Sequence, residues 1–288
     1  MESIWNSGGE PSAWHFIVAV YFAFGFVTVR FFLDRCVFRK LAIWLLSRRK
    51  TLLKHDKKTS EKIVKCSESL WKLTYYGTIE FCVLITAYRE PWFNDVKQYF
   101  RDLLDQELKL PLKLIYMCQC GFYMYGIAAL LVWETRRKDF SVMMSHHIVT
   151  LILIAFSYLT RFFRIGAVIL ALHDASDIFM EAAKTFKYAE IEIGASVSFG
   201  LFALSWLVLR LIYFPFWVIR ASSYHSCEVI NMSDPYYWGL YYVFNTMLFT
   251  LLGFHIYWWK LICAMIIKQL KSKGKVGEDI RSDSEDDD

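Results

Sequence analysis

Several ionisable side chains lie within apolar runs, where a charged or polar group is costly. His146 and His147 follow Ser145 near the start of the run 140–159, and the next run, 163–183, holds a second group. The members of the second group are His173, Asp174, Asp177 and Glu181. Ionisable residues inside membrane-length apolar segments indicate a functional site. Imidazoles and carboxylates together suit acid/base or nucleophilic catalysis.

The two groups are predicted to lie at one depth. Their runs are joined by only five residues, 160–164, so they form antiparallel neighbours. At 1.5 Å per residue, His146 and Asp177 each lie about 10 Å from the same side of the membrane. The i, i+3, i+7 spacing of Asp174, Asp177 and Glu181 places them on one helical face. We therefore expect one shared site.

These residues have two other interpretations, a structural polar network and a metal site. A polar network can hold membrane helices together without catalysis. Histidines on facing helices can also bind iron or zinc. The chain has seven His in all and no H-x-x-H-H box, so we favour catalysis without a metal.

The elements that must position these residues are long apolar runs. Hydrophobic residues make up 56% of the 288 residues, and charged residues gather between the runs. About 20 residues cross a bilayer as a helix. The sequence therefore predicts an all-α polytopic membrane protein with about seven transmembrane helices, at 14–33, 70–88, 112–133, 140–159, 163–183, 193–213 and 236–267.

The distribution of positive charge predicts the orientation. With the N-terminus outside, 21 Lys and Arg residues lie on the inner side and seven on the outer side. Positive residues concentrate in cytosolic loops, so the N-terminus is predicted to be luminal and the C-terminus cytosolic. The basic segment 35–65 lies between two apolar runs, which favours contact with membrane lipids and not with nucleic acid.

Two modification sites are also predicted. Asn231 begins an Asn-Met-Ser sequon in a loop expected to be luminal, five residues before the last apolar run. Ser282 and Ser284 each have an acidic residue three positions on, which suits phosphorylation by an acidophilic kinase in an otherwise solvated tail.

One motif carries a family resemblance. The stretch from Ser157 to Gly166, followed by Leu172–Asp177 and Glu181–Lys184, closely resembles the Lag1 motif of ceramide synthases, and His146–His147 resembles that family's paired histidines. Likeness to the wider TLC domain, a helical bundle, runs from about residue 67 to 268. We therefore divide the chain into an N-terminal segment with the first helix (1–66), a TLC domain with six helices (67–268) and an acidic tail (269–288).

The resemblance implies an activity and a location. Ceramide synthases transfer a fatty acyl group from acyl-CoA to the amine of a sphingoid base in the endoplasmic reticulum membrane, as homo- or heterodimers and without a cofactor. Arg161 stands where many animal members have Asn, and residues 1–66 do not resemble the homeobox-like segment of those members. The alternative is a non-catalytic TLC-type protein that senses lipids or assists at the translocon.

The resemblance also implies roles for residues. His146 would take the acyl group as an acyl-imidazole, and His147 would hold the carbonyl or the incoming hydroxyl. Asp174 and Asp177 would orient an imidazole and accept the amine proton. A scheme with His146 as general base stays open. Substrate-binding roles are expected for Ser145, Thr150, His173, Glu181 and Arg164.

Overall fold

A computed structural model describes residues 4–5, 10–47, 57–103, 105–134, 136–230 and 233–272. The described residues form helices and turns without a β-strand. The α-helices are α1 (Phe16–Leu33), α2 (Arg39–Ser47), α3 (Lys57–Tyr88), α4 (Leu110–Val132), α5 (Phe140–Leu159), α6 (Phe163–Tyr188), α7 (Glu192–Ser205), α8 (Ser226–Val229) and α9 (Pro235–Lys271).

Two of the long rods contain π-helical segments. Asp34–Phe38 joins α1 to α2, while Trp206–Ile219 and Ala221–His225 join α7 to α8. The predicted sixth span, 193–213, therefore ends too early, since the helix continues past Pro215 to Val229. Proline lacks a backbone donor, and the widened π-helical turns accommodate this loss.

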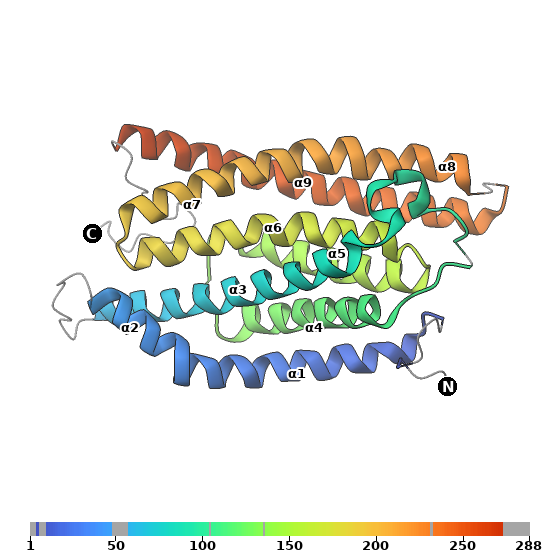
Figure 1. Ribbon diagram of the computed structural model, residues 1–288. Helices are drawn as coiled ribbons and strands as arrows, with labels where there is room; N and C mark the ends of the chain where they lie inside the picture. Colours follow the sequence, from blue (N-terminus) through green and yellow to red (C-terminus); the bar gives the residue numbers. More distant parts are fainter. Residues whose placement is uncertain are drawn as a thin grey trace.

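Five helical segments are long and apolar enough to span a membrane on composition alone: Ala13–Ser47, Leu110–Val132, Phe140–Leu159, Glu192–Val229 and Pro235–Lys271. The other two predicted spans lie in α3 and α6, which do not meet that criterion. Both helices are nevertheless long enough, at 32 and 26 residues, and both run along the others in one bundle (Figure 1). The structure confirms an all-α membrane bundle.

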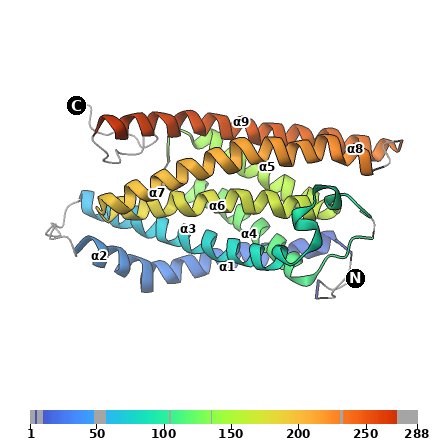
Figure 2. The same ribbon diagram turned by 45° about the horizontal axis from the view of Figure 1, so that its top comes forward.

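The centre of the bundle is α6. It packs against α3, α5, α7 and the π-helical segment, and it lies between the α7–α8 rod and α4 (Figure 2). On one side α1 approaches α4 closely at Gly121, where a Cβ atom would lie 2.6 Å from the carbonyl oxygen of Ala19. Only a glycine permits this approach.

The α5–α6 turn contains a residue in the left-handed backbone region. Arg161 has a φ of 66°. Asn adopts this region more readily than arginine does. The arginine side chain forms an ion pair with Glu10.

Successive long helices run antiparallel, so α1 begins and α9 ends at opposite ends of the bundle (Figure 1). A chain that crosses the bundle an odd number of times begins and ends on opposite sides. This arrangement agrees with the predicted placement of the two termini on opposite sides of the membrane.

Candidate active site

The paired histidines and the Lag1-like motif converge inside the bundle. The His146 ring centroid lies 6.4 Å from that of His173, with the rings nearly parallel, and 5.8 Å from that of His147. The rings of Trp258 and Phe254 in α9 pack on the His146 ring, with centroid distances of 5.2 and 5.9 Å. His146 is only 7% exposed, so this imidazole lies in an environment that excludes water.

His147 points to a different helix from His146, because neighbouring residues project about 100° apart around a helix. Its Nδ1–H donates to the carbonyl oxygen of Met143 at 2.8 Å, which leaves Nε2 as the acceptor of the neutral ring. The ring packs at 5.5 Å on Tyr123 and lies against Gly126 of α4. The absence of a side chain at Gly126 therefore makes room for His147.

The space at Gly126 gives a testable prediction. A Cβ atom there would lie 3.1–3.2 Å from Cδ2 and Nε2 of His147, so Gly126→Ala must displace the imidazole by a few tenths of an ångström. We expect turnover to fall roughly tenfold, since small displacements of reacting groups are costly. Steady-state product formation measures the effect.

Gly77→Ala on α3 is the matched control. Nothing lies within 4 Å of the added methyl group there. This substitution should keep turnover and slightly favour the helix. Equal turnover in Gly126→Ala and Gly77→Ala would contradict the idea that the position of the His147 ring matters.

A fourth imidazole, that of His255, joins the site from α9. His173 Nδ1–H donates to the carbonyl oxygen of Ile169 at 2.6 Å, and the Nε2 atoms of His173 and His255 lie 2.9 Å apart. With its proton on Nδ1, neutral His173 accepts at Nε2, so His255 donates. The two Nε2 atoms therefore share one hydrogen bond, which links α6 to α9. Sequence reasoning missed His255, although it interrupts an apolar run.

A buried ion pair lies beside this imidazole pair. Arg210 Nη2 is 2.9 Å from Asp177 Oδ1 and donates to the carbonyl oxygen of His173 at 2.8 Å. Its guanidinium lies 4.1 Å above the Trp206 ring, and its side chain is 3% exposed. Arg210 thus links Asp177 to the helical turn that carries His173. Sequence reasoning missed Arg210, the one charged residue between 193 and 219.

Asp174 has different partners from Asp177. Gln119 Nε2 donates to Asp174 Oδ2, and Tyr75 donates to Gln119 Oε1 at 2.9 Å. Among the described residues, the two carboxylates therefore bind an amide and a guanidinium, and not an imidazole. In the described part of the chain, Asp177 reaches the histidines through Arg210.

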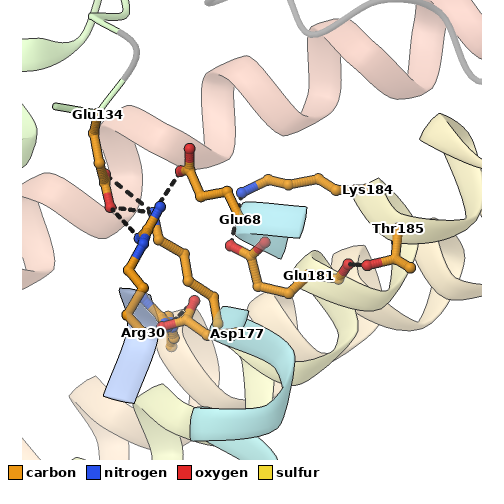
Figure 3. A network of polar contacts seen from close by, with 9 residues as sticks. Arg30, Glu68, Glu134, Asp177, Glu181, Lys184 and Thr185 are labelled. Carbon is orange, nitrogen blue, oxygen red and sulfur yellow. Dashed lines mark hydrogen bonds and ion pairs between the residues drawn. The ribbon is translucent and has the colours of Figure 1, made fainter. Parts of the chain in front are cut away.

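A network of charged residues lies at the adjoining end of the bundle (Figure 3). Glu181 is bound by Lys184 at 2.8 Å. From the other helices, Lys72 contacts Glu68 and Glu134 at 3.0 Å each. Arg30 lies beside Glu134 (Figure 3), and its Nη1 is 3.8 Å from Glu134 Oε1. Glu181 is thus part of a structural network as well as a neighbour of the site.

An apolar cavity lies between α4, α5, α6 and α9, and His173 is among the residues that line it. Thr150 and His173 line it at one end, and Phe100 and Ile230 line it at another. Thr150 lies one helical turn beyond His146. The other lining residues include Leu153, Ile154, Ile165, Ile169, Leu170, Phe244, Leu248 and Leu251. Such a cavity suits a hydrocarbon chain.

The remaining predicted residues lie elsewhere. Ser145 is exposed next to His146. Arg164 lies in the first turn of α6, where it donates to the carbonyl oxygen of Gln98 at 2.7 Å, nine residues before His173. This places it about 13 Å along the helix from the imidazoles. Asn231, Ser282 and Ser284 lie outside the described residues.

Comparison with known proteins agrees with this architecture. A family model described as the TLC domain matches residues 65–264. The fold and the match show a multi-pass membrane protein that belongs to the TLC-domain family, and within it to the ceramide synthases of the plant type.

The relatives cover nearly the whole chain. Ceramide synthase LOH2 of Arabidopsis thaliana is 63% identical over all of both chains, and ASC1-like protein 3 of Oryza sativa subsp. japonica is 59% identical over 97% of this chain and 98% of its own. Ceramide synthase 5 of Homo sapiens is 35% identical over 86% of this chain and 60% of its own length.

Proposed function

We propose that this protein forms ceramide by transferring a fatty acyl group from acyl-CoA to the amine of a sphingoid base. The observation that carries the proposal is the apolar cavity lined by His173, whose ring centroid lies 6.4 Å from that of His146. An acyl chain fills the cavity and brings its carbonyl carbon to the level of His146. Relatives with up to 63% identity are named ceramide synthases, which supports the same reaction here.

The geometry is compatible with a two-step transfer. A neutral nitrogen of His146 attacks the thioester carbonyl, the C–S bond breaks, and CoA leaves as the thiolate. The amine of the sphingoid base then attacks the acyl-imidazole, a C–N amide bond forms, and His146 is regenerated. The surplus proton of the amine passes to a basic group, with Asp177 and His147 as candidates.

In the alternative scheme, His146 acts as a general base for direct attack of the amine on the thioester. Neither scheme needs a metal or a cofactor, because a thiolate leaves readily. Of the two roles expected for His147, this geometry supports binding the incoming hydroxyl in both schemes, because Nδ1 donates to Met143 and Nε2 of the neutral ring is an acceptor.

The proposal includes a membrane orientation. CoA is too polar to enter the bilayer, so its thioester arrives from the cytosol. The 21-to-7 distribution of Lys and Arg supports a luminal N-terminus and a cytosolic C-terminus. The endoplasmic reticulum membrane, contact with membrane lipids and assembly as homo- or heterodimers follow from the family resemblance.

Purified protein tests the reaction directly. Given acyl-CoA and sphinganine, it should release free CoA and form dihydroceramide in equal amounts, as measured by thiol titration and mass spectrometry. N-acetylsphinganine, whose amine is blocked, is the matched control and should give no second acylation at nitrogen. A folded protein that binds both substrates without forming product would instead favour a non-catalytic lipid-sensing protein.

A further inference from the structure

The turn between α4 and α5 is anchored at both ends. At its start, Glu134 is held by Lys72 at 3.0 Å and lies 3.8 Å from Arg30. At its end, the buried Asp139 accepts a hydrogen bond from Trp258 Nε1 at 3.0 Å. The turn is therefore fixed against α1, α3 and α9.

Three consecutive basic residues, Arg136, Arg137 and Lys138, lie between these anchors, and we call them the basic turn. Arg136 and Lys138 are exposed. Together with Phe140 and Ser141, the basic turn lines an open groove. The Arg136 guanidinium lies 4.5 Å from the centre of the Phe140 ring. The groove thus combines positive charge, a hydroxyl group and an aromatic surface.

The groove adjoins the candidate active site. Ser141 precedes His146 by five residues on α5, or about 8 Å along the helix axis. Trp258 connects the two more directly, since it binds Asp139 and also packs on His146 at 5.2 Å. A ligand in the groove could therefore extend a flexible arm to the imidazoles.

We propose that the groove binds the phosphates of the acyl donor, the adenosine 3′,5′-bisphosphate end of CoA. This inference rests on the proposed function and deepens it. Arginine guanidinium groups bind phosphate with two parallel hydrogen bonds, and lysine adds a point charge. The basic turn would hold the nucleotide while the pantetheine arm reaches inward and the acyl chain enters the cavity. Lipid headgroups share the phosphate chemistry, but the position beside His146 favours the donor.

A donor without phosphates tests the proposal. We compare acyl-CoA with the acyl thioester of N-acetylcysteamine, which has the same reacting atoms. In the triple variant Arg136→Gln, Arg137→Gln, Lys138→Gln, kcat/KM for acyl-CoA should fall about 10- to 100-fold, because several charge-assisted hydrogen bonds are lost. The value for the truncated donor should change less than about twofold. The ratio of kcat/KM for acyl-CoA to kcat/KM for the truncated donor should therefore fall in the variant. An unchanged ratio would overturn the proposal.

The matched control removes three exposed charges at the same end of the bundle. Arg35, Arg39 and Lys40 lie at the α1–α2 junction, and Arg35 also packs on an aromatic ring, that of Phe31, at 5.0 Å. Replacing these three residues by Gln should leave both donors unaffected. An equal loss for acyl-CoA in this control would show a general charge effect and would also overturn the site.

Two further arms keep the test decisive. If the triple variant is not recovered folded, the single Gln variants replace it, each with an expected three- to fivefold fall in the donor ratio. Unchanged ratios in all three would overturn the proposal.

Nanodiscs of phosphatidylcholine with and without phosphatidylserine test headgroup binding. A loss with both donors that appears only with phosphatidylserine would assign the groove to lipid. Wild-type protein inactive with both donors would contradict the proposed function instead.

Discussion

Replacing His146 by alanine should abolish ceramide formation, with a fall of at least about 10³-fold. In the two-step scheme this imidazole carries the acyl group, so no other residue replaces it. Wild-type protein given acyl-CoA without amine should release one equivalent of CoA and gain the mass of one acyl group. The variant should show neither. Intact-protein mass spectrometry and rapid CoA titration measure these outcomes.

The control for this prediction is His225→Ala. His225 lies just before α8, where it is paired with Glu228 at 3.0 Å, and it takes no part in the imidazole cluster. Its loss should leave both the burst and turnover intact. An active wild type without burst or adduct would favour direct attack with His146 as general base. Full activity in His146→Ala would remove the site assignment.

The Asp177–Arg210 pair should give the second largest effect. Both side chains lie within the bundle, so removing one partner leaves a buried charge without its counter-charge. Asp177→Asn and Arg210→Gln should each lower the free energy of unfolding by about 3–5 kcal/mol. Turnover should fall by about 10²–10⁴-fold in each, since Arg210 also fixes the His173 turn and Asp177 is a candidate proton acceptor.

The double variant separates stability from catalysis. With both charges removed, much of the lost stability should return, while turnover stays low. Thermal unfolding in detergent and product formation measure the two properties. Lys62→Gln serves as the control, because its exposed pair with Glu190 at 3.1 Å should contribute less than about 1 kcal/mol. Turnover that recovered together with stability in the double variant would show that the pair is structural only.

The proximity of the two groups of ionisable residues was predictable. A short connection between two membrane-length runs makes them antiparallel neighbours, so residues at similar distances from the joined ends lie side by side. The His146 and His173 ring centroids lie 6.4 Å apart. Substrate roles for Ser145, Thr150 and Glu181 stay predictions.

The contributions of the other helices were not predictable. His255 and Arg210 lie in runs that are apolar on all sides, so hydrophobic periodicity does not fix the rotation of these helices. The π-helical segment Trp206–Ile219 also shifts the angular position of Arg210 away from a period of 3.6 residues. Its pairing with Asp177 therefore required the structure. The spans in α3 and α6 were predicted from apolar runs of about 20 residues, the length that crosses a bilayer.

The partners of α6 have a consequence for biogenesis. An acidic or basic residue at the centre of a helix disfavours insertion by about 2.5–3.5 kcal/mol, and α6 carries Asp174, Asp177 and Glu181 within its predicted span. In the finished bundle Asp177 is neutralised by Arg210, which the ribosome adds 33 residues later. Until Arg210 has been synthesised, Asp177 has no counter-charge, so the transfer of α6 from the translocation machinery into lipid carries a high free-energy cost. Its release into the bilayer should therefore await synthesis of the Glu192–Val229 rod, so the helices leave in groups and not one by one.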